Sequence, residues 1–188
     1  MSTARSAAAI AVLITCAGQA LAMPAVPRQS PDFSVYEPAA KQTVRISDLK
    51  GKVVVIEFMF LQSAHCLRVA QMLNDLHKEL GPRGLQPVGI VFGPNMSQSA
   101  VTSFVQYFKL GYPVGYASTE QVDGYMGRGA KEVLNIPQIV VIDRAGMIRA
   151  QNGSKYDTAL ENEGSLRELL ERLLKESTPG TEKTKKKE

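Results

Sequence analysis

Cysteine and histidine are both scarce in this chain. Its 188 residues contain only two cysteines, Cys16 and Cys66, and two histidines, His65 and His77. There is neither a Cys-x-x-Cys pair nor a pair of histidines at metal-ligand spacing. The sequence therefore predicts no zinc or haem site and no metal or other cofactor. A glycine-rich phosphate loop after a strand is missing as well, and we assign no chemistry to His77.

Concentrated charge of one sign is missing from most of the chain. The formal net charge is +4, and the basic residues are scattered except at residues 183–187. This distribution predicts no nucleic-acid partner. Residues 177–188 contain a Pro-Gly pair, after which lysine and glutamate are mixed. We expect them to form a disordered, Lys-rich tail, with contact to a membrane surface or a partner as the weaker alternative.

The apolar run near the N-terminus is too short to span a bilayer, which takes roughly 20 residues. It extends from Ala7 to about Ala17, follows the positively charged Arg5, and precedes the small-residue pattern Ala20-Leu21-Ala22. This combination is typical of a secretory signal peptide. We therefore expect residues 1–22 to be cleaved near Ala22 and the protein to be secreted or periplasmic. A retained anchor is the alternative, and only in that case is a membrane tether expected.

Cleavage of this leader also removes Cys16. Cys66 is then the single cysteine of a protein in an oxidising compartment, and it has no internal partner for a disulfide. An unpaired cysteine of this kind is buried and inert, paired with another molecule, or reactive.

The remaining residues predict one α/β domain over residues 33–176, preceded by a flexible, Pro-rich lead-in over residues 23–32. Expected strands are a short hairpin (33–35 with 43–46), three apolar strands (53–60, 85–92 and 113–117), and a second hairpin (136–143 with 147–151). Expected helices cover 64–80, 97–110 and 164–175, and broken helical turns interrupted by Gly124, Gly127 and Gly129 cover 119–134. This alternation predicts a mixed central β-sheet flanked by helices, without internal repeats.

Two stretches resemble the TlpA/ResA-type thiol–disulfide oxidoreductases of the thioredoxin superfamily, whose domain is of the AhpC/TSA-redoxin type. They are SDLKGKVVVIEFMFLQSAHC (47–66) and VLNIPQIVVIDRAGMIRA (133–150). The first is similar to the opening of that domain and the second to its latter half. The resemblance implies a thioredoxin-like sandwich. It also implies protein thiols or disulfides, or an unidentified envelope protein, as partners.

The family's active motif is Cys-x-x-Cys at the start of the first long helix. The resemblance places Ser63 at the first cysteine and Cys66 at the second. In the family, the first sulfur attacks a disulfide as a thiolate favoured by the helix N-terminus, and the second resolves the mixed disulfide. A serine hydroxyl cannot attack in this way, so a two-cysteine cycle is excluded and Cys66 is the only redox atom. Ser63 also suits a helix N-cap. The alternative for Cys66 is a buried core residue on the apolar side of its helix.

The resemblance assigns roles to neighbouring residues too. Glu57 matches a buried acid that moves the proton of the resolving cysteine, and burial is expected to raise its pKa. A place at the sheet edge, or a lysine partner, is the alternative for Glu57. His65 matches a histidine that holds positive charge near a thiolate, and a solvent-facing position is its alternative. Pro137, after Ile136, matches the family's cis-proline, which offers backbone to a bound peptide.

Two other functions stay open. One-cysteine peroxiredoxins share this fold and use the motif Pro-x-x-x-Thr/Ser-x-x-Cys. Ser63 fits that motif, but Met59 stands at its proline position and Gln138 where an arginine is expected. The other alternative is a redox-inactive module that binds peptides or proteins around Ser63, His65 and Pro137.

Overall fold

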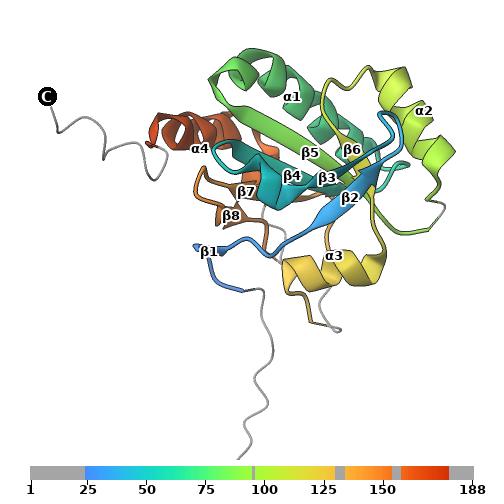
Figure 1. Cartoon of the computed structure of the whole chain (residues 1–188), viewed down its shortest axis with the longest axis horizontal. Helices are drawn as coiled ribbons and strands as arrows, with labels where there is room; N and C mark the ends of the chain where they lie inside the picture. The colour runs from blue at the N-terminus through green and yellow to red at the C-terminus, as the bar shows by residue number, and fades with distance from the viewer. Residues whose placement is uncertain (1–23, 95, 130–133, 154–157, 178–188) are drawn as a thin grey trace, which may run out of the picture.

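The computed structural model describes residues 24–94, 96–129, 134–153 and 158–177. The expected leader and nearly all of the expected tail lie outside these residues. Within them, β4 (Val53–Met59) is a central strand of an eight-stranded mixed sheet (Figure 1), in the order β1-β8-β7-β4-β5-β6-β2-β3. It runs parallel to β5 (Leu85–Val91) and antiparallel to β7 (Gln138–Ile142). All seven residues of β4 are buried, as expected for a nearly unbroken apolar strand covered on both faces.

The two predicted hairpins are confirmed. The first pairs β2 (Ser34–Glu37) with β3 (Gln42–Arg45), and the second pairs β7 with β8 (Met147–Gln151). β6 (Val114–Tyr116) joins β5 to β2.

Part of the segment expected to be a flexible lead-in is ordered instead. Residues Arg28–Gln29 form β1, which pairs with β8. The Arg28 guanidinium donates to the Gln151 side chain at 2.7 Å, and the Ser30 N–H donates to the Gly146 carbonyl at 2.9 Å. The physical reason is that β8 would otherwise be the sheet edge, where its backbone groups would lack partners.

Four α-helices are present among the described residues: α1 (Ala64–Leu80), α2 (Gln98–Phe108), α3 (Thr119–Met126) and α4 (Glu163–Lys175). Three short 3₁₀ turns accompany them: η1 (Ile46–Leu49), η2 (Gly81–Arg83) and η3 (Ala159–Glu161). The bounds of α1 agree with the prediction. None of the described helices is long and apolar enough to cross a membrane.

Two predicted helix ends were wrong. α3 continues through Gly124 and stops at Gly127, whose φ of +68° is a left-handed conformation that glycine adopts more readily than other residues. α2 ends before Lys109, which adopts φ 51°, rather than at Gly111. Residues 130–133, the end of the expected broken turns, lie outside the described residues.

The sheet separates two hydrophobic cores. Val53, Val55 and Met59 of β4 pack in the core that contains α1, α2 and α4 residues. Val54, Ile56 and Phe58 pack in the other core, with α3 residues. Figure 1 shows α1 and α3 on opposite sides of the sheet. Since side chains alternate along a strand, Glu57 points to the same side as Val55 and Met59, toward α1.

Candidate functional site

The N-terminus of α1 is capped by Ser63, as predicted. Ser63 has extended backbone angles (φ −88°, ψ 113°), and its hydroxyl oxygen accepts a hydrogen bond from the Cys66 N–H at 3.3 Å. An N-cap serine satisfies a backbone donor that the helix leaves without a partner. The Ser63 side chain is therefore held over the first turn of α1.

We expect Ser63→Ala to lower the free energy of unfolding by about 1 kcal/mol, because one N–H of the first turn loses its acceptor. Urea denaturation monitored by circular dichroism measures this change. Ser63→Thr, which keeps the hydroxyl, should recover most of the loss. The control is Ser103→Ala at an exposed position inside α2, which should leave the midpoint nearly unchanged. Equal effects of the two alanine variants would contradict the cap.

Cys66 is buried in the core under α1, with 1% of its surface exposed. Burial raises the pKa of its thiol; hydrogen bonds from the Ser63 side chain and the Phe60 backbone oppose that rise, while the Glu57 carboxylate adds to it. The balance leaves the thiol pKa raised, so the thiol is protonated at neutral pH. Ser63 and Phe60 both act on the thiol pKa, and both belong to the loop between β4 and α1. This loop therefore lies next to the Cys66 sulfur.

Glu57 lies in the middle of the sheet rather than at an edge. It is fully buried, between Gly89 of β5 and Ile139 of β7. Among the described residues, neither carboxyl oxygen has a hydrogen-bond partner. The alternatives of an edge position or a lysine partner are therefore wrong. Burial, and secondly the nearby charge of Glu161, hold the pKa of Glu57 well above its ordinary value.

The structure adds Glu161 to the site, which the sequence did not predict. Glu161 ends η3, and its side chain is 8% exposed. Its Oε1 accepts a hydrogen bond from Asn152 Nδ2 at 3.4 Å. Asn152 in turn accepts the Ile139 N–H at 2.8 Å through Oδ1, and Ile139 is the cross-strand partner of Glu57. Asn152 thus ties Glu161 to the strand beside Glu57.

His65 lies between this carboxylate and solvent. Its Nε2 is 2.5 Å from Glu161 Oε2, and 40% of its side chain is exposed. The His65 side chain is therefore partly exposed to solvent, as the alternative expected, but its ring also contacts a buried acid. The contact joins the first turn of α1 to η3.

Ile136 and Pro137 lie at the same end of the sheet as the motif. The peptide bond between them is cis, as the resemblance implies. Ile136 is partly buried and packs against both cores. Gln138, the next residue, pairs with Phe58 and donates through Nε2 to the Asn135 carbonyl at 2.7 Å. Since Ile139 faces the core that contains Cys66, alternation turns Gln138 to the other face, away from the thiol.

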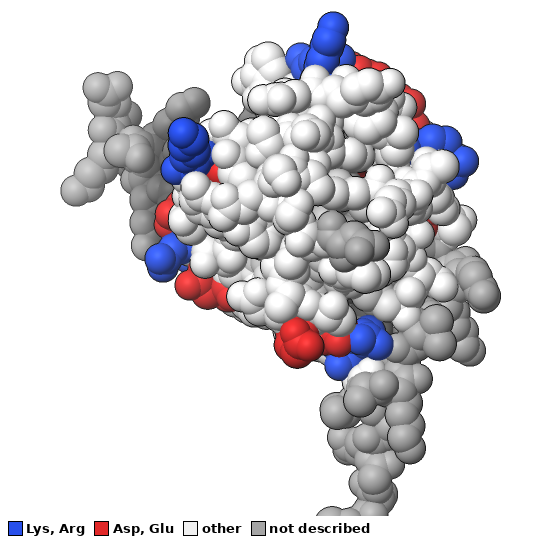
Figure 2. Space-filling model, turned by 90° about the vertical axis from the view of Figure 1, so that its right-hand side faces the viewer, with Lys and Arg blue, Asp and Glu red and all other residues white. Residues whose placement is uncertain are grey.

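An apolar pocket of about 370 Å³ adjoins Ser63. It lies between the β4–α1 loop, the end of β5 and the start of α2, and its lining includes Phe60, Leu61, Ser63, Phe92, Pro94 and Met96. Figure 2 shows the side of the molecule on which α2 lies, where charged side chains sit around the edge and leave the centre uncharged. The sequence agrees, because residues 84–108 contain no Lys, Arg, Asp or Glu.

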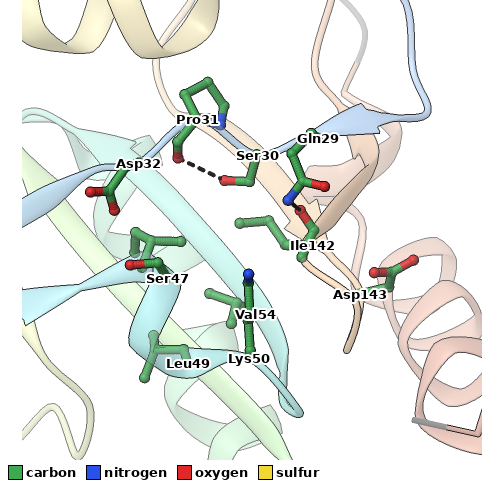
Figure 3. A pocket seen from close by; sticks show the side chains of 12 residues that line it. Gln29, Ser30, Pro31, Asp32, Ser47, Leu49, Lys50, Val54, Ile142 and Asp143 are labelled. Carbon is green, nitrogen blue, oxygen red and sulfur yellow. Dashed lines mark hydrogen bonds between the residues drawn. The ribbon is translucent and has the colours of Figure 1, made fainter. Parts of the chain in front are cut away.

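A second pocket lies at the opposite end of the sheet (Figure 3). Its volume is about 210 Å³, and it contains Val54 and Ile142, which are cross-strand partners near the start of β4. Figure 3 shows the Lys50 ammonium rising between the lead-in residues Gln29 and Ser30 and the turn that holds Leu49. None of the sequence-predicted site residues lines this pocket, so the candidate site is the motif end.

Comparisons with known proteins show the family and the fold of the chain. The family model of AhpC/TSA matches residues 26–151. The thiol-disulfide oxidoreductase ResA of Bacillus thuringiensis (strain Al Hakam) is 24% identical over 124 residues, covering 66% of this chain and 67% of that protein.

Solved structures show the same fold. A thioredoxin-family thiol:disulfide interchange protein from Chlorobium tepidum TLS superposes with a TM-score of 0.66 at 21% identity, over 80% of this chain and 99% of that one. A putative protein disulfide isomerase from Bacteroides thetaiotaomicron gives 0.65 at 22% identity, over 82% and 93%. The predicted thioredoxin-like sandwich is thereby confirmed. Among the described residues, no group of three or more His, Cys, Asp or Glu side chains is arranged to hold a metal ion.

Proposed function

Since the chain belongs to the AhpC/TSA family, we propose that it is an exported TlpA/ResA-type protein that binds other proteins at the motif end of its sheet. In this proposal Cys66 is its single redox group. Similarity to thiol–disulfide oxidoreductases supports protein thiols or disulfides as the substrate class. The leader expected at residues 1–22 supports a secreted or periplasmic location.

The observation that carries this proposal is the arrangement of Ser63 above Cys66. Ser63 stands where the family has its attacking cysteine, and its hydroxyl is engaged as a helix cap 3.3 Å from the Cys66 backbone nitrogen. Cys66, at the resolving position, is buried. A partner that reaches the motif therefore meets a hydroxyl first, which cannot open a disulfide.

The thiol chemistry that remains is a single exchange step. The Cys66 thiol loses its proton, and its sulfur attacks one sulfur of a partner disulfide. The disulfide bond breaks, and the second partner sulfur leaves as a thiolate that takes up a proton. Cys66 is the free cysteine among the described residues, so no neighbouring thiol releases the mixed disulfide. The product is a lasting covalent complex rather than a turnover cycle.

The surface around Ser63 supports a protein partner with apolar side chains. The exposed ring of Phe60 packs against Phe92 with centroids 4.8 Å apart, and both line the uncharged pocket beside Ser63. Pockets of this kind accept a large apolar side chain of an extended segment. Ile136 and Pro137 are proposed to supply the backbone that such a segment contacts.

A redox-inactive binding module is the second candidate, and the burial of Cys66 favours it. The sulfur is protonated and enclosed in the free protein, so binding at the pocket does not require it. A one-cysteine peroxidase fits less well, because attack on peroxide needs a thiolate. The effects on the Cys66 pKa come from burial, Ser63, the Phe60 backbone and Glu57, none of which is a cation.

The rate of Cys66 alkylation against pH tests the proposal. The full chain with Cys16→Ser is treated with iodoacetamide from about pH 6 to pH 10, a range that brackets the ordinary cysteine pKa. We expect slow labelling whose apparent pKa lies above that of the same chain in urea. Each unit of this rise lowers the thiolate fraction at neutral pH about tenfold.

The other outcomes decide between the alternatives. Labelling only under unfolding conditions favours the redox-inactive module. Labelling with an apparent pKa below that of the unfolded chain contradicts the proposal and favours a peroxidase, which a peroxide titration then checks. A Cys66→Ser variant controls for reaction at other residues.

A further inference from the structure

Exposure increases stepwise along three titratable side chains at the motif end. Glu57 is 0% exposed. The Glu161 side chain is 8% exposed, and the His65 side chain is 40% exposed. They come from β4, α1 and η3, and η3 is distant in sequence from the other two.

Contacts join the outer residues of this group to one another, whereas no hydrogen bond joins Glu57 to Glu161 among the described residues. Glu161 Oε2 is 2.5 Å from His65 Nε2, which is an ion-pair distance, although the atoms are not aligned as a hydrogen bond. Asn152 donates to Glu161 Oε1 at 3.4 Å and is fixed to the Ile139 N–H at 2.8 Å, on the strand beside Glu57. Glu161 is also the charged residue whose field acts on Glu57.

Glu57 needs such a connection for the chemistry proposed above. A protonated carboxyl cannot accept the Cys66 proton until it has released its own. Its two oxygens are buried without a hydrogen-bond partner among the described residues, so the proton has no direct way to water.

Other neighbouring groups do not offer this route. Tyr112 is 3% exposed, donates its hydroxyl to the Ala70 carbonyl at 3.1 Å, and burial raises its pKa well above the ordinary value. Cys66 is buried and is itself the group that must lose a proton. Glu161 and His65 are the titratable neighbours that lead outward.

We propose that Glu161 and His65 form the proton path between Glu57 and solvent, and that Asn152 is the positioning residue that holds Glu161 in this path. The Glu57 carboxyl gives its proton to the Glu161 carboxylate when the two groups move into hydrogen-bond contact, which they do not make in this structure, and Glu161 Oε2 passes one to His65 Nε2. His65 then releases its Nδ1 proton to water. One proton leaves, Glu57 becomes a carboxylate, and no electrons move. The purpose of this path, to prepare Glu57 for the Cys66 proton, rests on the proposed function.

The test is hydrogen–deuterium exchange of the Glu57 carboxyl, followed by infrared spectroscopy after dilution of the full chain into D₂O. The C=O stretch of a protonated carboxyl shifts when its proton is replaced by deuterium, and loss of the band in Glu57→Gln assigns it. We expect Glu161→Gln and His65→Gln to slow this exchange about tenfold or more, a loss typical of removing a positioned proton carrier. Asn152→Ala should slow it less.

Rescue and control variants separate a path from a general change in stability. Free imidazole should restore exchange in His65→Ala, where it can replace the missing ring, and not in Glu161→Gln. Glu163→Gln, two residues from Glu161, removes a carboxylate that contacts Arg167 at the surface and should exchange at the original rate.

Exchange at the original rate in Glu161→Gln and His65→Gln overturns the path. Equally slow exchange in the control variant Glu163→Gln would also overturn the path. The proposed function is judged separately, by Cys66 labelling. If Cys66 never reacts while the variants still slow exchange, the path stands and the thiol function fails. If Cys66 reacts and the variants exchange at the original rate, the thiol function stands and the path fails.

Discussion

Ser63→Cys is expected to create a disulfide with Cys66 and to give the protein disulfide-reductase activity. The Ser63 hydroxyl lies 3.3 Å from the Cys66 nitrogen and is one of the groups that act on the pKa of the thiol, so we expect a sulfur at position 63 to stand close to the Cys66 sulfur. A cysteine at a helix N-terminus has its pKa lowered, and a shift from about 8.5 to about 7 raises its thiolate fraction at neutral pH more than tenfold. The buried Cys66 then takes the resolving role.

The experiment uses the full chain with Cys16→Ser, with and without Ser63→Cys. After mild oxidation, mass spectrometry should find a loss of two hydrogens and no free thiol in the double variant. Insulin reduction should rise from background. Ser97→Cys provides a matched control, since Ser97 caps α2 in the same way but is not the cap above Cys66. Two free thiols after oxidation of Ser63→Cys would show that Ser63 does not occupy the attacking position.

Glu57→Gln is expected to stabilise the protein at neutral and alkaline pH and to flatten its stability against pH. The folded pKa of Glu57 is raised well above its ordinary value by burial and by Glu161. In the unfolded chain the same carboxyl ionises near pH 4.3. The native state therefore binds the extra proton. The stability that comes from binding this proton is fully present below the unfolded pKa of Glu57. It is lost as the pH rises from there through the folded pKa.

Each unit of the pKa difference corresponds to about 1.4 kcal/mol at high pH, so the gain of Glu57→Gln should grow between mildly acidic pH and pH 8. Glu57→Met, which removes both polar oxygens, should add roughly 1–3 kcal/mol more, since no unsatisfied group then remains buried. Urea denaturation across this pH range measures both effects. A constant difference between variant and parent at every pH would contradict the raised pKa.

Glu171→Gln is the control with the opposite sign. The Arg83 guanidinium donates two hydrogen bonds to Glu171 at 2.7 Å and lowers the pKa of this carboxyl. The stability that this ion pair contributes is present above the unfolded pKa of Glu171. It is lost as the pH falls through the folded pKa. Because solvent and salt screen this surface pair, the change should be small.

Periodicity predicted most of the fold because the core is built from regular elements. The bounds of α1 follow from its apolar positions at three- and four-residue spacing and from Ser63 at its start. β4 follows from its unbroken apolar run. The continuous helix α3 was harder to predict. Gly124 lowers helix propensity, but it does not prevent a helix that is anchored by the buried side chains of Val122 and Met126.

The candidate site was only half predictable. Glu57, Ser63 and Cys66 stand within ten residues of one another, so a local motif reveals them. Glu161 and Asn152 have no such signal, since tertiary folding brings η3 and the end of β8 to the motif. The hints are modest: an apolar Leu160 beside Glu161, and an Asn directly after a strand. The burial of both Glu57 and Glu161 at the motif end is visible only once the chain is folded.

The sheet order gives the motif two separate flanks. β5 borders β4 on the side of the apolar pocket, and β7 borders it on the side of Asn152 and Glu161. A partner segment seated against Phe60 and Ser63 would therefore shut water away from the sulfur and still leave the imidazole of His65 in contact with the medium. The proposed proton path would then stay open at its outer end after the partner has docked, while the sulfur is closed off from solvent.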